Sequence, residues 1–177
     1  RGTASHFGLE DEVDIIMSTF SKSAASLGGF IASEERVINY VKHASRPFIF
    51  SASIPPSNAA VAREALRIMK EEPDRPLRLK ANSDYMRAGF KARKIPIIDG
   101  ETAIIPVMTY TNDRTFIITK MLLEAGVYVN PVICPAVKPG ECLLRTSYTA
   151  THTKDQLDRA LEVFSAVFKQ ADEMGLE

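Results

Sequence analysis

Apolar and polar runs alternate near the start of the chain. Residues 12–17 are short, β-branched and apolar, which predicts a buried strand. A polar cluster follows at residues 18–23, and residues 24–29 then supply small side chains that let other groups approach the backbone closely. The pattern predicts a strand that ends in a loop carrying one lysine, Lys22.

Two helices are expected in the next part of the chain, at residues 34–43 and at residues 57–71. In both stretches the apolar positions recur at spacings of three and four, which places them on one face of a helix. Ser57 or Asn58 is expected to cap the second helix, because a short polar side chain can accept a backbone N–H there. Pro73 is expected to end it.

A short strand is expected between these helices, at residues 48–53. Pro55 and Pro56 follow it, and neither can donate to a β-ladder. A third helix is predicted at residues 76–94, where basic and apolar side chains interleave.

The last third of the chain begins with an expected strand at residues 102–110, despite Pro106. Asn112 or Asp113 is expected to cap the following amphipathic helix, with Gly126 as its C-terminal stop.

Two further strands and a last helix complete the pattern. One strand is expected to start at residues 127–129, and a second at residues 142–148 returns beside it after a loop. Thr153 and Gln156 have the Thr-x-x-Gln spacing of a capping box, which predicts the start of the last helix. The order strand, helix, strand, strand, helix predicts a compact α+β lobe.

Charge balance argues against a nucleic-acid or anionic-membrane partner. Lys plus Arg number 22 and Asp plus Glu number 22, so the formal net charge is zero. The basic residues of the helix at 76–94 could form a nucleic-acid surface, but a solvated helix face is the better interpretation.

Length and composition are those of an ordinary globular protein. The 177 residues, 45% of them hydrophobic and 25% charged, suffice for one domain or for one domain and part of another. No apolar run approaches the ~20 residues of a membrane helix, so no transmembrane segment is expected. Cys134 and Cys142 have neither Cys-x-x-Cys spacing nor a histidine partner, which predicts no metal site, a reducing compartment and a cytoplasmic location.

Lys22 is the residue most suggestive of chemistry. Hydroxyl side chains surround it in the sequence, at Thr19, Ser21, Ser23 and Ser26, and no carboxylate lies nearby to pair with it. An ammonium at a partly desolvated site loses its proton more readily, and the neutral amine can condense with an aldehyde cofactor. Neighbouring hydroxyls could then bind the phosphate of that cofactor. From these residues alone, an ordinary surface-loop lysine is the commoner alternative.

Three ordered motifs extend this interpretation over nearly the whole chain. Residues 19–23 with Gly28 and Gly29 resemble the pyridoxal-phosphate attachment segment of the α-oxoamine synthases, which belong to the fold-type-I aminotransferase superfamily. Residues 46–56 resemble the segment that this family places soon after its lysine. Residues 144–152 resemble its C-terminal strand that binds the substrate carboxylate.

The resemblance implies an α/β fold in two parts. Residues 1–75 would be the end of the large cofactor-binding domain, and residues 76–177 a small α+β C-terminal domain. Residues 129–132 and 151–153 most resemble the bacterial members that use serine. The implied activity is condensation of serine with a long-chain acyl-CoA to give a 3-keto sphingoid base. Sister activities with alanine or glycine, or a noncatalytic dimerising relative, are the alternatives.

The resemblance also implies the roles of individual side chains. Lys22 would hold pyridoxal 5'-phosphate covalently and then act as acid or base at the α-carbon of the amino acid. Thr19 and Ser21 would donate hydrogen bonds to the phosphate or the ring oxygen. Ser51 and Ser53 would reach into the phosphate site of a partner subunit, which implies a homodimer.

Arg145 is expected to clamp the carboxylate of the amino acid. A surface arginine paired with an acid is the alternative for this position.

Some residues depart from the family pattern or are expected to play no catalytic part. Ala24 stands where the attachment segment usually has a bulky residue, two places after the lysine. His152 is expected to be structural, and Cys134 and Cys142 to be ordinary thiols, although they flank a loop that resembles a substrate-covering loop.

Arg1 and Gly2 resemble the end of the family's Gly-rich stretch, and the resemblance places the cofactor-binding aspartate, the ring-stacking residue and much of the phosphate site upstream of it. The 177 residues alone are therefore expected to be inactive and to bind the cofactor weakly.

Overall fold

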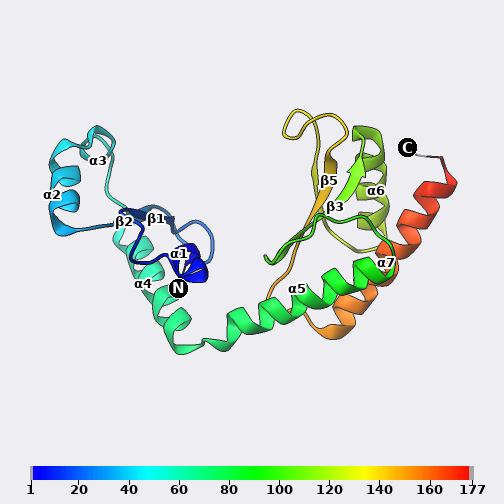
Figure 1. Ribbon diagram of the computed structural model, residues 1–177, viewed down its shortest axis with the longest axis horizontal. Coiled ribbons are helices and arrows are strands. Elements are labelled where there is room, and N and C mark those ends of the chain that lie inside the picture. The colour runs from blue at the N-terminus through cyan, green and yellow to red at the C-terminus, as the bar shows by residue number, and fades with distance from the viewer. Residues whose placement is uncertain (1, 176–177) are drawn as a thin grey trace. The chain divides into compact units, whose positions relative to one another are not determined.

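The computed structural model describes residues 2–175. The chain divides into two compact units, Arg1–Glu72 and Pro73–Glu177, and each is described here by itself (Figure 1).

The first unit combines a small antiparallel β-pair with four helices. Its elements are α1 (Thr3–Phe7), β1 (Ile16–Thr19), β2 (Gly29–Ala32), α2 (Glu35–Ala44), α3 (Arg46–Ile49) and α4 (Pro56–Glu71). Strand β1 pairs with β2 from Ile16 opposite Ala32 to Thr19 opposite Gly29. Among residues 2–72, only Ala24, Ser26 and Ala62 are buried, so this unit has almost no core of its own.

The helices expected at 34–43 and 57–71 are confirmed, but three other expectations for this unit are wrong. Neither Ser57 nor Asn58 caps the second helix, because both lie inside α4, whose cap is Pro55 without a side-chain hydrogen bond. The strand at 12–17 lies instead at Ile16–Thr19 and is exposed along its whole length. The strand expected at 48–53 is absent, and α3 occupies its first part. Local chemistry explains the helix: Ser45 Oγ accepts the N–H of Phe48 at 3.4 Å, and Pro47 in the first turn has a φ suited to a helix.

The second unit contains a three-stranded antiparallel sheet and three long helices. Its elements are α5 (Asp74–Ala92), β3 (Ile104–Tyr110), α6 (Asn112–Glu124), β4 (Asn130–Val132), β5 (Cys142–Ser147) and α7 (Lys154–Glu173). The strand order is β3-β5-β4, with β5 in the centre. The predicted order of strand, helix, strand, strand and helix is confirmed, although β4 begins three residues later than expected.

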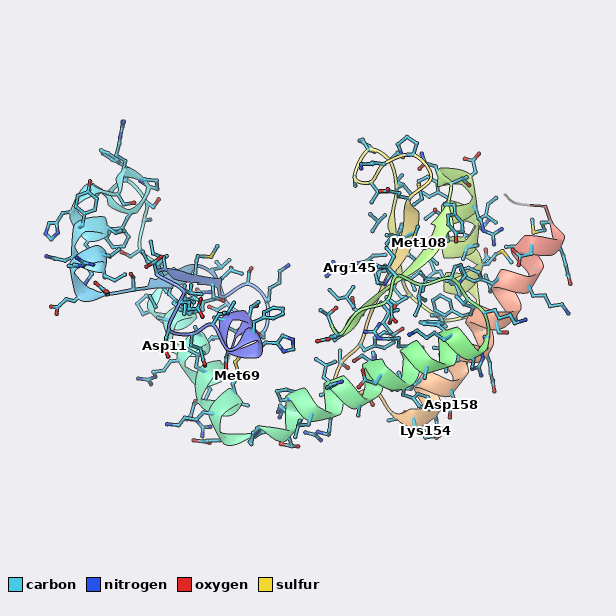
Figure 2. All side chains as sticks on the ribbon, in the orientation of Figure 1. Asp11, Met69, Met108, Arg145, Lys154 and Asp158 are labelled. Carbon is cyan, nitrogen blue, oxygen red and sulfur yellow. The ribbon has the colours of Figure 1, made fainter. Side chains whose placement is uncertain are left out.

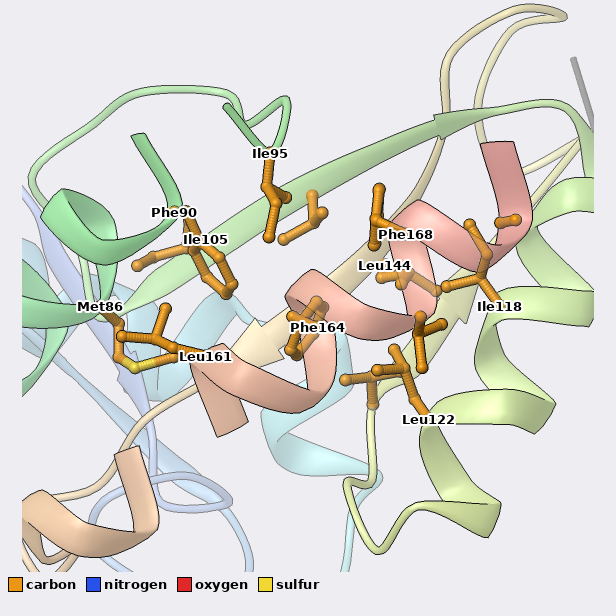
Figure 3. Close-up of a cluster of buried hydrophobic side chains, with 14 of the residues drawn as sticks. Met86, Phe90, Ile95, Ile105, Ile118, Leu122, Leu144, Leu161, Phe164 and Phe168 are labelled. Atoms are coloured by element: carbon orange, nitrogen blue, oxygen red, sulfur yellow. The ribbon is translucent and has the colours of Figure 1, made fainter. Parts of the chain in front are cut away.

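One face of this sheet is buried beneath the helices. Burial alternates along β3 and β5, so that Ile105, Val107 and Leu144 point into the core. Figure 3 shows the side chains from the helices that meet them, which include Met86, Phe90, Ile118, Leu122, Leu161, Phe164 and Phe168. The rings of Phe90 and Phe164 cross edge to face with centroids 5.0 Å apart. The second unit therefore has a core of its own.

Helix starts in this unit follow local capping chemistry. The capping box is confirmed: Thr153 Oγ1 accepts the N–H of Gln156 at 3.3 Å, and Gln156 Oε1 accepts the N–H of Thr153 at 2.9 Å. The cap of α6 is Thr111, one residue earlier than expected. Asn112 is engaged elsewhere, because its Oδ1 accepts from the backbone N–H of Cys134 and from the Cys142 thiol.

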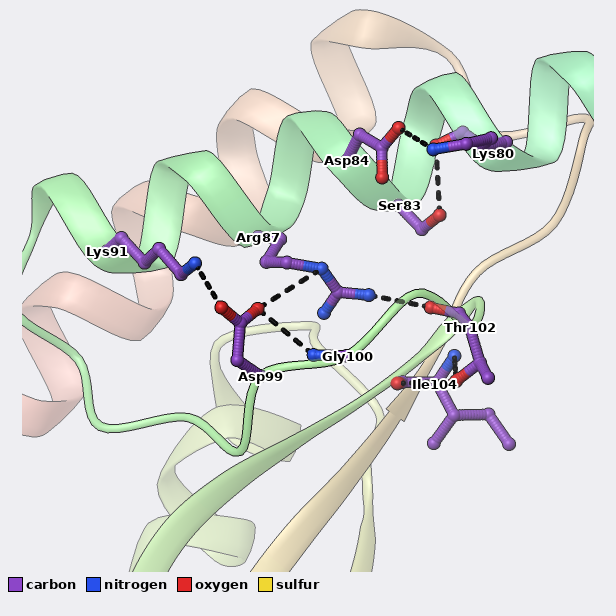
Figure 4. A network of polar contacts seen from close by, with 9 residues as sticks. All are labelled: Lys80, Ser83, Asp84, Arg87, Lys91, Asp99, Gly100, Thr102 and Ile104. Carbon is purple, nitrogen blue, oxygen red and sulfur yellow. Dashed lines mark hydrogen bonds and ion pairs between the residues drawn. The ribbon is translucent and has the colours of Figure 1, made fainter.

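Ion pairs on α5 account for several basic residues of this helix. Lys80 pairs with Asp84 at 2.6 Å, and Lys91 with Asp99 at 2.5 Å. Figure 4 shows how Asp99 also lies beside Arg87, whose Nη2 donates to the carbonyl of Thr102 at 2.8 Å. This network fastens α5 to the segment that leads into β3.

Candidate active site

Lys22 lies in the tight loop that joins β1 to β2. The N–H of Phe20 donates to Gly28 O at 2.9 Å, and the N–H of Ala25 donates to Lys22 O, also at 2.9 Å. Gly28 has a φ of +88°, and a Cβ built on it would lie 2.5 Å from Cγ2 of Ile54. The loop therefore requires glycine at this position, both for its backbone conformation and for the close approach of Ile54.

The far side of the loop is fastened to the first turns of α4. Ser26 Oγ donates to the backbone carbonyl of Asn58 at 2.7 Å. Ala24, the small residue that departs from the family pattern, is buried here. The lysine is thus carried by a loop with two anchors, the β-pair and α4.

Two hydroxyl groups accompany the lysine, as expected. Thr19 Oγ1 lies 2.9 Å from Ser21 Oγ, and the N–H of Ser21 donates to Thr19 Oγ1 at 3.2 Å. Thr19 also donates to Gly28 O at 3.2 Å, which ties both hydroxyls to the turn. All three side chains, Thr19, Ser21 and Lys22, are exposed.

Lys22 has no carboxylate within ion-pair distance in the part of the chain that the structure describes. Exposure of Lys22 differs from the partly desolvated setting expected from the sequence. A primary amine without an acidic partner, one and three positions along the chain from two hydroxyl side chains, has the chemistry to bind an aldehyde that carries a phosphate.

Ser51 and Ser53 are exposed in the segment between α3 and α4. Ser53 directly precedes Ile54, the residue in close contact with Gly28 at the base of the lysine loop. The first unit therefore places this segment next to the loop.

Arg145 lies on β5, in the centre of the sheet of the second unit (Figure 2). Its neighbours across the sheet are Pro106 on β3 and Asn130 on β4. Arg145 is exposed and has no acidic partner among residues 2–175.

The sheet face that carries Arg145 is the face opposite the core, and we call it the open face. Burial alternation along β3 and β5, and the register of β4 against β5, assign to it Ile104, Pro106, Met108, Tyr110, Asn130, Val132, Leu143, Arg145 and Ser147. Most of these side chains are apolar, and Arg145 is the one ionised group among them. A single cation on an apolar surface is suited to binding one anionic group of a small molecule.

Sequence reasoning did not identify Asn130 as the neighbour of Arg145 across the sheet. Strand alternation alone could not reveal it, because the pairing depends on the register between β4 and β5.

Other candidate groups have structural roles. The N–H of Thr149 donates to His152 Nδ1 at 3.2 Å, as fits the expectation that this histidine is structural. Burial and the neighbouring thiol of Cys142 raise the pKa of the Cys134 thiol, which makes it a poor nucleophile at neutral pH. No helix among the described residues is long and apolar enough to cross a bilayer.

Comparison with known proteins agrees with the fold and the motifs. The family model described as "Aminotransferase class I and II" matches residues 1–164. The chain belongs to this family. Its sequence is 48% identical over 171 residues to a serine palmitoyltransferase of Sphingobacterium spiritivorum, covering 97% of this chain and 43% of that protein. It is also 40% identical over 175 residues to a putative 8-amino-7-oxononanoate synthase 2 of Mycobacterium tuberculosis, covering 99% of this chain and 23% of that protein.

A solved structure confirms the expected fold class. The chain superposes on a high-resolution structure of SPT (serine palmitoyltransferase) with PLP internal aldimine, at a TM-score of 0.92 and 34% identity, covering 97% of this chain and 44% of that one. The expected resemblance to the α-oxoamine synthases is thereby confirmed. The chain spans less than half the length of these curated relatives.

Proposed function

We propose that this chain is part of a pyridoxal-phosphate-dependent enzyme that condenses serine with an acyl-CoA. Carbon dioxide and CoA leave, and the product is a 3-keto sphingoid base. The observation that carries this proposal is the lysine loop: Lys22, which has no acidic partner among residues 2–175, follows the hydrogen-bonded pair Thr19 and Ser21 in a turn closed by backbone hydrogen bonds. Similarity to serine palmitoyltransferases along 97% of the chain supports serine as the amino acid.

In this proposal, residues 1–75 end the cofactor-binding domain and residues 76–177 form the smaller domain. Lys22 binds the aldehyde carbon of the cofactor through its amine. Thr19 and Ser21 can each rotate a hydroxyl toward the phosphate or the ring oxygen, because both are exposed beside Lys22. The cofactor, once bound, supplies an electron sink for the bonds of the α-carbon. The amine of Lys22 would also hold or move the proton at that carbon.

Arg145 binds and orients the amino acid in this proposal. A guanidinium can donate two parallel N–H bonds to a carboxylate, which fixes both its position and its plane. The central position of β5 keeps the backbone of Arg145 fixed by hydrogen-bonded strands on both sides. Orientation matters because the bond to be broken must lie perpendicular to the plane of the electron sink.

The proposed assembly is a cytoplasmic homodimer in which Ser51 and Ser53 serve the phosphate site of the partner subunit. The first unit has almost no core of its own, so the rest of the large domain or a partner subunit would have to cover it. Large apolar side chains are exposed on it, among them Met17, Phe48 and Phe50. Surface of this kind is normally covered by other protein.

A second candidate is an 8-amino-7-oxononanoate synthase or a glycine-specific relative, in which the same lysine and arginine act on another amino acid. The 40% identity to the putative 8-amino-7-oxononanoate synthase 2 of Mycobacterium tuberculosis supports this second candidate. A noncatalytic dimerising relative is less well supported, because it has no need of an unpaired lysine at position 22 or of an unpaired arginine at position 145.

A substrate panel separates these candidates. The complete gene product that carries this sequence, loaded with cofactor, is given serine, alanine or glycine with palmitoyl-, pimeloyl- or acetyl-CoA, and products are identified by mass spectrometry. We expect the 3-keto sphingoid base from serine and palmitoyl-CoA. Turnover of alanine or glycine alone would refute the choice of serine, and no turnover of any pair would favour the noncatalytic relative.

A further inference from the structure

One row of three residues crosses the sheet at Arg145. Pro106 of β3, Arg145 of β5 and Asn130 of β4 are direct partners in the two ladders. Asn130 and Arg145 are both exposed. Residues paired across antiparallel strands project to the same face, so both side chains rise from the open face.

Asn130 is the only member of this row that can orient the guanidinium through a side-chain hydrogen bond. Paired residues on antiparallel strands have Cβ atoms about 4.5–5.5 Å apart, which is within reach of an asparagine amide and an arginine side chain. Pro106, on the other side, has no polar side-chain atom. Ser147, the next polar residue on this face, pairs with Ile104 in a different row.

An amide at this position has an advantage over an acid. A carboxylate beside Arg145 would form an ion pair with it and compete with an anionic ligand. The carbonyl oxygen of an amide can accept one of the five guanidinium N–H groups without neutralising the charge, and its NH2 remains a donor. The guanidinium would thus be oriented and still positively charged.

We propose that Asn130 is a positioning residue for the amino-acid substrate. When the substrate is bound, its side-chain oxygen would accept an N–H of Arg145, and its NH2 would face the carboxylate that the guanidinium binds. This inference depends on the proposed role of Arg145 as the carboxylate-binding group. It predicts that Asn130 governs amino-acid affinity more than the rate of the chemical steps.

Three variants of the complete gene product test the proposal. Asn130→Ala removes the amide, and Asn130→Asp replaces it with a competing charge of nearly the same shape. Asn39→Asp is the matched control, because Asn39 is exposed on α2 in the other unit and receives the same chemical change.

Steady-state kinetics with serine provide the first measurement. For Asn130→Ala we expect the KM for serine to rise about tenfold, the usual effect of losing a hydrogen bond to a charged group, while kcat changes less than twofold. Asn130→Asp should raise KM more than Asn130→Ala, whereas Asn39→Asp should leave it unchanged. A KM for Asn130→Ala within twofold of wild type, or a fall in kcat alone, would overturn the proposal.

A second measurement does not depend on turnover. Phenylglyoxal modifies accessible arginines, and mass spectrometry of the peptide that contains Arg145 reports its labelling. Serine should protect Arg145 in the wild type, and about tenfold more serine should be needed in Asn130→Ala.

The two proposals can fail separately. If the wild type neither turns over serine nor shows protection of Arg145, the proposed function fails. If the wild type does both and Asn130→Ala matches it, only the role of Asn130 fails.

Discussion

The contact between α5 and α7 allows a sharp test of the core beneath the sheet. Gly89 of α5 faces Leu161 of α7, and a Cβ added to Gly89 would lie 2.4 Å from Cδ1, 2.7 Å from Cδ2 and 3.1 Å from Cγ of Leu161. The substitution Gly89→Ala would therefore drive a methyl group into a leucine side chain that is 1% exposed. Because Leu161 is almost fully buried, its side chain has little free space into which it could rotate away from the added methyl group.

Two opposing effects determine how much Gly89→Ala changes the free energy of unfolding. Alanine is favoured over glycine inside a helix by about 1 kcal/mol. Overpacking a tight core costs about 1–3 kcal/mol, and the upper half of that range applies to three overlaps of this size. The expected net effect of Gly89→Ala is a destabilisation of about 1–2 kcal/mol.

Truncating Leu161 should reverse the sign of the effect that Gly89→Ala has on stability. In a Leu161→Ala background the overlapping carbons are gone, so Gly89→Ala should stabilise by up to about 1 kcal/mol. Urea unfolding of residues 73–177, followed by circular dichroism, gives the four free energies of this double-mutant cycle. If Gly89→Ala had the same sign in both backgrounds, the close approach of α5 to α7 would be refuted.

Three further predictions concern the second unit. Burial raises the pKa of Tyr148 to about 12 from an ordinary value near 10, despite its hydrogen bond to Thr146. The neutral phenol is therefore favoured in the folded state, and the stability this provides is present below pH 10 and lost as the pH rises towards 12. Urea unfolding at pH 8 and pH 11 should show that the wild type loses about 1.4 kcal/mol more than Tyr148→Phe, and equal losses would contradict the burial of this ring. Arg145→Lys should lower kcat/KM for serine about 10- to 100-fold, because a lysine cannot bind a carboxylate through two parallel N–H bonds, and Arg145→Ala should lower it further. Unchanged kinetics in both variants would contradict the role of the guanidinium. Thr153→Ala should destabilise residues 73–177 by about 1 kcal/mol, because the capping box of α7 is lost. Urea unfolding measures this difference, and an unchanged free energy of unfolding would mean that α7 does not depend on its cap.

The elements that sequence reasoning predicted well depend on local signals. The capping box at Thr153 and Gln156 involves residues three apart, and the apolar face of α7 repeats with the helical period. The error at residues 48–53 has a local cause too, since Pro47 and the Ser45 hydroxyl favour a helical turn over a strand in an apolar run. Apolar character alone does not distinguish the two.

The candidate site also has features that depend on local sequence and features that depend on the rest of the fold. Thr19, Ser21 and Lys22 lie within four consecutive positions, and the structure joins the Thr19 and Ser21 side chains in the turn that also carries Lys22. The pairing of Asn130 with Arg145 depends on the register of β4 against β5, which is set by the turn and the core rather than by either strand alone. Exposure of Lys22 could not be inferred locally, because it depends on what the rest of the fold places over the loop.

The central claim is that the amine of Lys22 binds an aldehyde cofactor, and chemical trapping tests it most directly. The complete gene product is incubated with pyridoxal 5'-phosphate, reduced with borohydride, digested and analysed by peptide mass spectrometry, with Lys22→Ala as the matched control. We expect the reduced pyridoxyl group on Lys22 in the wild type and on no lysine in the variant. Labelling of a different lysine, or equal labelling of the wild type and Lys22→Ala, would contradict the account.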